Sequence, residues 1–197
     1  MIPTPLLNAD DMDAVFQQMR SFWVGRGKRV TELEEVMADW VHAKHAVAFG
    51  SGRAALMVAI RLLMAETVAC FTPVRCNAID QAISMAAADR GGLQADVRIS
   101  VYPLRGGEIE DFCKFLPRKH SVTLQGKYGA FSFGALKDVT GGIGGCLVSN
   151  EPIKADDWKL LAPISDINAA MILSQLKRYE GHQTHRLVAE SKVWEVV

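Results

Sequence analysis

The chain has 197 residues, 22 basic and 22 acidic side chains, and hydrophobic residues at 49% of its positions. This length and apolar fraction suit one domain with an ordinary core. The formal net charge of zero excludes a global field that would draw the protein to nucleic acid or to a membrane surface, and no apolar run of about 18 residues exists to span a bilayer. We therefore expect no nucleic-acid partner and no membrane partner.

The opening residues, 1–16, carry acidic side chains early and hold no continuous apolar stretch of the kind a secretory signal peptide needs. The cysteines lie far apart and form no C-x-x-C pair, so we expect neither a zinc site nor a disulfide framework. They are Cys70, Cys76, Cys113 and Cys146. We interpret them as buried or half-buried thiols of a cytoplasmic protein without a metal site.

Two helices are predicted before residue 45. Residues 10–20 form the first, with Asn8 or Asp10 as its N-terminal cap. In the second, apolar residues recur at the spacing of one helix face. Thr31 and Glu34 fit a capping box, so this helix is predicted to begin after Thr31.

Beyond residue 45, short apolar strands alternate with helices. We predict strands at 45–50, 68–73, 96–103, 120–125, 129–134 and 144–149, and helices at 50–65, 77–88 and 108–116. Such alternation favours an α/β fold of three layers, in which helices cover both faces of a mainly parallel sheet.

The last part of the chain is predicted to be helical, at 155–162, from Ser165 onward, and at 181–197. No repeat or linker interrupts the sequence, so one domain is the simplest interpretation. It would consist of N-terminal helices (1–45), an α/β core (46–150) and C-terminal helices (151–197).

The first candidate site is GSGRAAL, residues 50–56, where a glycine turn follows a predicted strand and opens a helix. Backbone N–H groups at such a turn can approach a phosphate, and the helix dipole adds positive potential. Arg53 offers a charged donor in the first helical turn. The alternative is a plain strand-to-helix turn that needs glycine only for its backbone angles.

The second candidate site is FSFGALKDVTGGIGG, residues 131–145. Its lysine, Lys137, stands between an apolar strand and a glycine-rich loop, where it would be partly desolvated. Desolvation lowers the pKa of an amine and leaves it nucleophilic toward carbonyl groups. The alternative is an ordinary surface lysine.

Together these segments resemble the DegT/DnrJ/EryC/StrS sugar aminotransferases, pyridoxal-phosphate-dependent enzymes of fold type I. The turn resembles that family's HAVAVSSGTAAL segment, and the lysine segment resembles its FSF…K…TGEGG segment. Residues 22–41, 72–83 and 165–178 resemble three further family segments, and all five stand in the family's order. The resemblance covers most of the chain, from Pro5 to Arg186.

The resemblance implies pyridoxal 5'-phosphate as cofactor and assigns roles to individual residues. Lys137 matches the lysine that holds the cofactor as a Schiff base and later moves a proton. Ser132 matches a hydroxyl that contacts the cofactor phosphate. The expected cofactor-binding residues are Gly52, Arg53, Ala54, Asn77, Gln125, Ser132 and Lys137, of which the first three supply backbone amides to the phosphate.

Several positions depart from the family's pattern. If Gln125 aligns with the glutamine of the family's EDAAQA segment, Val122 stands where that segment has the aspartate that pairs with the ring nitrogen of the cofactor. Asn77 stands near the position of the aromatic residue that stacks on the ring. Gly134 replaces a histidine and Arg53 replaces a threonine. The family's GYNYR segment is missing, and its smaller second domain is expected to be largely absent.

The resemblance implies transfer of an amino group from an amino acid, with glutamate expected, to a keto-sugar nucleotide, by a homodimer. The alternative is a catalytically degenerate relative that serves as a scaffold or partner subunit, with Lys137 as a relic. The lysine and the phosphate turn favour the first reading, whereas the loss of the ring-nitrogen aspartate favours the second.

Overall fold

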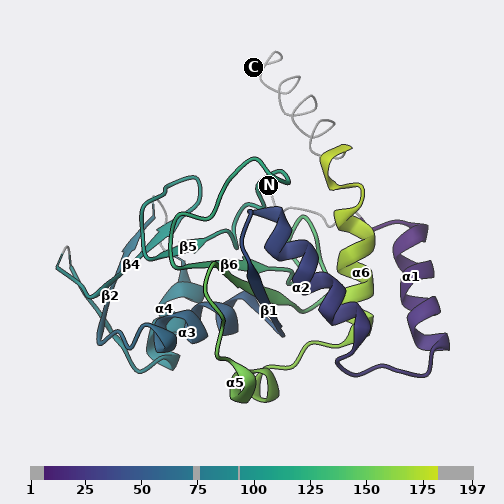
Figure 1. Ribbon diagram of the computed structural model, residues 1–197, viewed down its shortest axis with the longest axis horizontal. Helices are drawn as coiled ribbons and strands as arrows, with labels where there is room; N and C mark the ends of the chain where they lie inside the picture. Colours follow the sequence, from purple (N-terminus) through teal and green to yellow (C-terminus); the bar gives the residue numbers. More distant parts are fainter. Residues whose placement is uncertain (1–6, 73–75, 93, 182–197) are drawn as a thin grey trace, which may run out of the picture.

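The computed structural model describes residues 7–72, 76–92 and 94–181. Within these ranges, six helices and seven strands follow one another along the chain, and Figure 1 shows how they are arranged. The helices are α1 (Ala9–Arg20), α2 (Lys28–Trp40), α3 (Gly52–Leu62), α4 (Asn77–Met85), α5 (Asp156–Leu161) and α6 (Asp166–Leu176). The strands are β1 (His45–Phe49), β2 (Thr67–Phe71), β3 (Asp89–Arg90), β4 (Val97–Val101), β5 (Ile109–Asp111), β6 (Tyr128–Ser132) and β7 (Gly145–Ser149).

The strands form one sheet in the order β1-β7-β6-β5-β4-β2-β3. Strand β7 runs antiparallel to both of its neighbours, β1 and β6. All the other neighbouring pairs are parallel. The predicted α/β fold with a mainly parallel sheet is therefore confirmed, and the carboxyl ends of the parallel strands meet along one edge.

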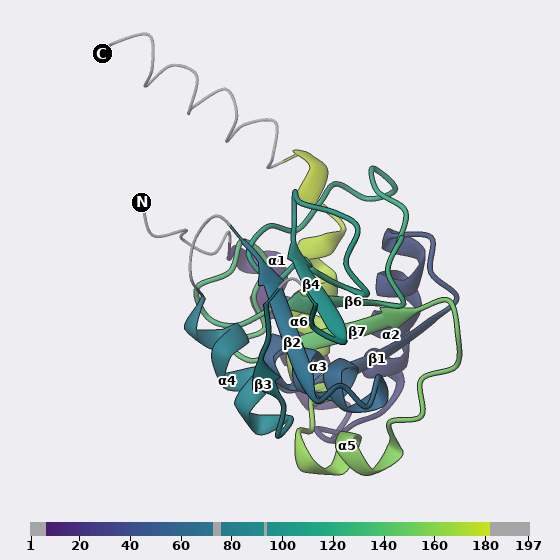
Figure 2. The ribbon, with the colours of Figure 1, turned by 90° about the vertical axis from the view of Figure 1, so that its left-hand side faces the viewer.

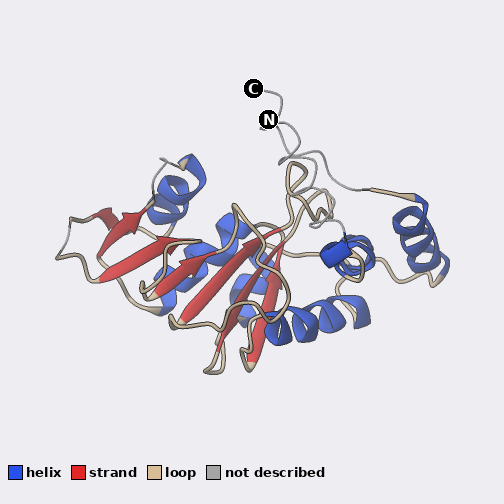
Figure 3. Cartoon of the chain, turned by 90° about the horizontal axis from the view of Figure 1, so that it is seen from above, coloured by secondary structure: helices blue, strands red, loops and turns tan. Residues whose placement is uncertain are grey.

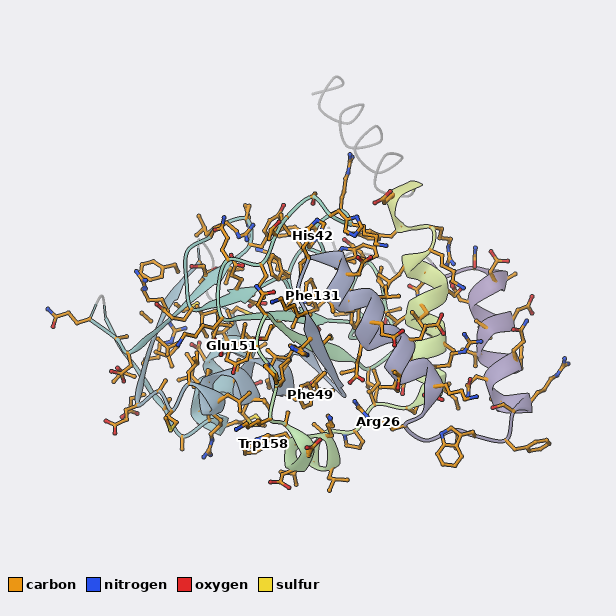
Figure 4. All side chains as sticks on the ribbon, in the orientation of Figure 1. Arg26, His42, Phe49, Phe131, Glu151 and Trp158 are labelled. Atoms are coloured by element: carbon orange, nitrogen blue, oxygen red, sulfur yellow. The ribbon has the colours of Figure 1, made fainter. Side chains whose placement is uncertain are left out.

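Helices cover both faces of this sheet, as Figure 3 shows from above. Buried residues of α3 and α4 pack with Phe49 on one face, and those of α2 and α6 pack with Phe131 on the other. Both phenylalanines lie in the interior of the molecule, whereas Trp158 of α5 lies at its periphery (Figure 4). Helix α1 stands outside this three-layer body and contacts α6 (Figure 1).

The caps explain where two of the helices begin. Asn8 closes a capping box at α1, and Ser165 closes one at α6, as their side chains predict. The capping box predicted at Thr31 is wrong, because α2 already begins at Lys28. Glu34 instead accepts a hydrogen bond from the backbone N–H of Ala48, at 2.8 Å, and ties α2 to β1.

Two of the predicted elements between the fourth and the sixth strand are wrong. The segment 108–116, predicted as a helix, begins with β5 and continues as a loop, and 120–125, predicted as a strand, is also loop. Strand β5 has only three residues and is buried on both faces between β4 and β6. So short a strand has no readable alternation, and its acidic residues mimic a helix surface.

Three smaller predictions concern the whole chain. The cysteines that the structure describes are free thiols, with Cys146 buried and the other three half-buried, as predicted. No helix in the described ranges is both long and apolar enough to cross a bilayer. The helix predicted at 181–197 falls, beyond its first residue, outside the part of the chain that the structure describes.

Candidate active site

The site lies where β5 and β6 end, on the face of the sheet that α3 covers. The parallel register pairs Asp111, the last residue of β5, with Ala130 of β6. Side chains alternate along a strand, so Asp111, Ala130 and Ser132 point to the same face. Ala130 packs with the buried residues of α3. The register thus brings a carboxylate and a hydroxyl together in front of α3.

The N-terminus of α3 packs closely against this edge. Ser51 is its N-cap, and the Ser51 Oγ accepts a hydrogen bond from the Ala54 N–H at 3.1 Å. A Cβ atom at Gly52 would come within 2.6 Å of the Ser132 Cβ and 2.7 Å of the Cys113 Sγ. Only glycine allows this approach, which places the first-turn amides beside Ser132.

One detail of the expected phosphate turn needs correction. The first four N–H groups of a helix have no intrahelical partner, which makes them available to an anion. At α3, however, the Ala54 N–H is already taken by Ser51. Gly52 and Arg53 are thus the residues of the predicted trio whose amides are better placed for an anion, and the exposed Arg53 side chain stands on the same turn.

Lys137 lies in the loop that joins β6 to β7. The Lys137 backbone N–H donates to the Gly134 carbonyl at 3.0 Å, which closes a turn and leaves the residue half-buried. At the base of the loop, the Phe133 N–H donates to the Gly144 carbonyl at 2.8 Å, and the Gly141 N–H donates to the Phe133 carbonyl at 2.9 Å. These bonds hold the loop against the strand ends.

Helix α6 anchors the same loop from the other face. The buried Gln175 amide accepts from the Thr140 N–H at 3.0 Å and donates to the Thr140 carbonyl at 2.6 Å. The Asn168 amide donates to the Gly141 carbonyl at 2.8 Å. Two side-chain amides of α6 therefore fix the backbone three and four residues beyond Lys137.

Asp111 and Lys137 are electrostatic neighbours. Burial raises the pKa of Asp111, which is only 3% exposed, and this effect outweighs the hydrogen bonds from Cys113 and the positive charge of Lys137, which lower the pKa. Among the described residues, the Lys137 ammonium group has no hydrogen-bond or ion-pair partner. This edge of the sheet thus combines a buried acid of raised pKa with an amine that has no partner among the described residues.

Asp111 is not among the site residues predicted from the sequence. The resemblance to the family puts the aspartate position at Val122, which lies in the loop after β5 and packs against the α2 and α6 side of the core. The buried carboxylate whose pKa is raised by burial and lowered by the charge of Lys137 is Asp111, the last residue of β5. The run IED after a proline-closed strand was the available signal, and the prediction of a helix over 108–116 concealed it.

Two predicted site residues lie apart from this cluster. Gln125 precedes the amino end of β6, so the length of that strand separates it from Ser132, and its N–H donates to Glu110 at 2.9 Å. A cofactor contact of Gln125 stays a prediction from the family resemblance. Asn77 is the exposed first residue of α4, and its side chain makes no hydrogen bond with the described part of the chain.

The site is an open edge, not an enclosed pocket. The Lys137 loop and the segment after β5 enclose a cavity of only about 10 Å³, with room for about one water molecule. A hollow of about 460 Å³ lies between α1 and α6 and shares no lining residue with the site. A bound cofactor would therefore lie over the edge. Within the described ranges, no group of His, Cys, Asp or Glu side chains could hold a metal ion.

Comparisons with known proteins agree with this architecture. Residues 5–88 match the DegT/DnrJ/EryC1/StrS aminotransferase family, which confirms the family resemblance predicted from the sequence. The spore coat polysaccharide biosynthesis protein SpsC of Bacillus subtilis (strain 168) is 37% identical over 57 residues, which cover 29% of this chain and 15% of SpsC.

Two solved structures show the same fold. PseC of Helicobacter pylori, an aminotransferase involved in the biosynthesis of pseudoaminic acid, superposes with a TM-score of 0.73 at 19% identity, over 90% of this chain and 65% of PseC. DesI, solved in the presence of its TDP-sugar product, gives a TM-score of 0.72 at 18% identity, over 91% of this chain and 60% of DesI. The chain thus spans less than two thirds of the length of each of these relatives.

Proposed function

We propose that this chain binds pyridoxal phosphate at the carboxyl edge of the sheet and is the cofactor-binding part of a sugar aminotransferase. The observation that carries the proposal is the convergence of Lys137, Asp111, Ser132 and the α3 N-terminus on one face of one edge. These groups come from four separate segments of the chain. Their chemistry matches the three parts of the cofactor: an aldehyde, a ring nitrogen and a phosphate.

The phosphate would bind at the turn between β1 and α3. An eleven-residue helix presents its positive end there, and the Ser132 hydroxyl stands beside it because Gly52 has no side chain. The exposed guanidinium of Arg53, where the family has threonine, adds a charge-assisted donor. These groups fit a phosphate dianion, because the dianion needs several hydrogen-bond donors and the first turn of α3, Ser132 and Arg53 supply them.

Asp111 would pair with the ring nitrogen. When bound, pyridoxal phosphate supplies an electron sink that stabilises a carbanion next to the amino group of the substrate. Asp111 would hold a proton on the ring nitrogen, because an ionised carboxylate in a dry site strongly favours a cationic partner. A buried acid that no described cation contacts is suited to this role. The alternative of a catalytically degenerate scaffold is based on the absence of this aspartate, and Asp111 offers a carboxylate for the same role.

Lys137 would join the cofactor covalently and then move a proton. Its amine is uncommitted, and the anchors at Thr140 and Gly141 restrict the reach of its loop. Restricting the approach of an amine to a tethered aldehyde lowers the entropy cost of the reaction. Nothing else in the cluster offers a nucleophilic amine.

The substrates and the assembly follow from the relatives. PseC is an aminotransferase involved in the biosynthesis of pseudoaminic acid, and DesI has a TDP-sugar product. We therefore propose a keto-sugar nucleotide as acceptor and an amino acid, with glutamate expected, as donor. The open edge also favours a homodimer, since a second subunit would cover a cofactor that the chain alone leaves exposed.

The proposal is tested by mixing the purified chain with pyridoxal phosphate and recording its visible absorption. We expect a new band, and borohydride reduction followed by peptide mass analysis should find the cofactor on Lys137. The Lys137→Ala variant should lose the band, whereas Lys127→Ala, which alters an exposed lysine before β6, should keep it. No band at millimolar cofactor, or label spread over several lysines, would overturn the proposal. If glutamate is the amino-group donor, adding it should then abolish the visible absorption band.

A further inference from the structure

Helix α1 has the reverse of the polarity expected for a surface helix. A surface helix normally turns its apolar side chains inward and its polar side chains to solvent. The buried residues of α1 are instead Asp11 and Gln18. The Asp11 carboxylate pairs with the Arg178 guanidinium beyond α6, and the Gln18 amide donates to the Trp23 carbonyl at 2.6 Å. The inward face of α1 is thus polar at its buried positions.

The large apolar residues of α1 point to solvent. Met12, Phe16 and Met19 are 49%, 52% and 50% exposed. Their spacing of four and three residues places them in one stripe along the helix, which we call the outer face of α1. Figure 1 shows α1 at one end of the long axis of the molecule, and Figure 2, seen from the opposite end, shows the sheet in front of it. The outer face of α1 shares no residue with the candidate active site.

Two opposite charges border the outer face of α1 on the same side. Asp13 directly follows Met12, and Arg20 directly follows Met19, so both stand on one flank of the stripe. Both side chains are exposed, and neither has an ion-pair partner within the described ranges. They cannot pair with each other in one helix, because seven residues of helix rise by about 10 Å.

We propose that the outer face of α1 binds the same face of a second copy of this chain, with the two helices antiparallel. A two-fold axis at the middle of the helix sets Phe16 beside its own counterpart and Met12 beside the partner subunit's Met19. The same axis brings Asp13 of each copy to Arg20 of the other, because an antiparallel pair places equivalent flanks on the same side. Opposite charges therefore meet twice, and the stripe is complementary to itself.

A parallel pair of helices does not have this complementarity. It would set the charged flank of each helix against the opposite flank of its partner, where the half-buried Val15 lies. Asp13 and Arg20 would then lack counter-charges, so the charge pattern favours the antiparallel arrangement. The inference does not depend on pyridoxal phosphate or on a subunit contact over the cofactor edge, because the outer face of α1 lies outside that site.

Association is tested by sedimentation velocity over a concentration series of the purified chain. One helix from each copy makes a small interface, so we expect a dissociation constant in the micromolar range. Phe16→Glu places two carboxylates at the centre of the interface and should weaken association at least about 100-fold. The matched control is Leu160→Glu, which alters an apolar side chain of α5 that is 82% exposed and should have no effect. A wild type that stays monomeric throughout the series, or Phe16→Glu that associates as the wild type does, would overturn the proposal.

The charged flank tests the antiparallel orientation. Asp13→Arg and Arg20→Asp should each weaken association by about three- to tenfold, because each sets like charges against each other at both ends of the interface. The double variant, Asp13→Arg with Arg20→Asp, restores opposite charges and should associate about as tightly as the wild type. Circular dichroism verifies that each variant keeps its helix content. If the two substitutions weaken association additively in the double variant, the charges do not meet across two copies and the antiparallel arrangement is wrong.

Discussion

Glu110 and Asp111 are neighbours in β5 and both are buried, yet their surroundings differ completely. Glu110 points to the α2 and α6 face, pairs with Arg105 and accepts hydrogen bonds from the backbone N–H groups of Gln125, at 2.9 Å, and Gly126, at 3.3 Å. Asp111 points to the α3 face, where its Oδ1 accepts a hydrogen bond from the backbone N–H of Cys113 at 2.7 Å. No described cation is in contact with it.

The contrast separates a carboxylate that stabilises the fold from one that is kept available. A buried charge is tolerated when it is paired and its lone pairs are satisfied, as at Glu110. An acid buried without such pairing costs stability, and such groups concentrate at functional sites. Two adjacent residues of one strand thus meet opposite requirements because a strand directs successive side chains to opposite faces.

The largest expected change in stability is at Glu110, the carboxylate that is paired with Arg105. Glu110→Gln should lower the free energy of unfolding by about 3–5 kcal/mol, because it leaves the half-buried Arg105 without its counter-charge. Urea unfolding at neutral pH measures this change. Glu35→Gln, at an exposed position of α2, is the control and should change little. Equal effects of the two substitutions would end the distinction between a structural and a functional carboxylate.

A smaller loss is expected at the anchor of the lysine loop. Gln175→Leu should cost about 2–3 kcal/mol, since it leaves the buried N–H and carbonyl groups of Thr140 without partners. Thermal unfolding provides the measurement, and Gln17→Leu on the exposed side of α1 is the control. If Gln175→Leu is as stable as the control, the loop is held by the strand ends alone.

At Asp111, which has no paired cation, a substitution should stabilise the chain instead of destabilising it. The folded chain retains the Asp111 proton at pH values where the unfolded chain has lost it, so stability falls as pH rises from the ordinary aspartate value of 3.8 through the raised folded value. Asp111→Asn has no proton to lose. We expect it to stabilise the cofactor-free chain at neutral pH, by less than the loss expected for Gln175→Leu, with no gain below pH 3.8. A loss at neutral pH would contradict the contrast.

The smallest effect is expected at the lysine itself. Lys137→Met should change the free energy of unfolding by no more than about 0.5 kcal/mol, because the amine makes no hydrogen bond or ion pair with the described residues. The same variant should lose the cofactor absorption. A large destabilisation would show that Lys137 serves the fold, as Glu110 does.

The sequence revealed the parts of the site that are local in the chain. The glycine turn at Gly52 and the lysine five residues after Ser132 are each contained in one short segment, so their spacing could be recognised directly. Ser165 predicted the start of α6 because an N-cap acts on the residues that directly follow it.

The missing parts depend on contacts between distant segments. Asp111 became recognisable only when β4 and β6 paired on either side of a three-residue strand. The role of Gln175 depends on a bond to Thr140, 35 residues earlier in the chain. Neither the burial of a short strand nor the partner of a helix side chain is encoded in local periodicity.

The direction of β7 determines how Lys137 is held. In an all-parallel sheet, the chain leaving Ser132 would cross to the far edge before starting the next strand. Because β7 is antiparallel to β6, Gly145 lies opposite Ser132, and residues 133–144 leave and re-enter the sheet at the same edge. Lys137 therefore lies in a loop that reverses the chain direction and is anchored to the sheet at both ends. Residues inserted at its tip would change the reach of the amine without disturbing the register of the strands below.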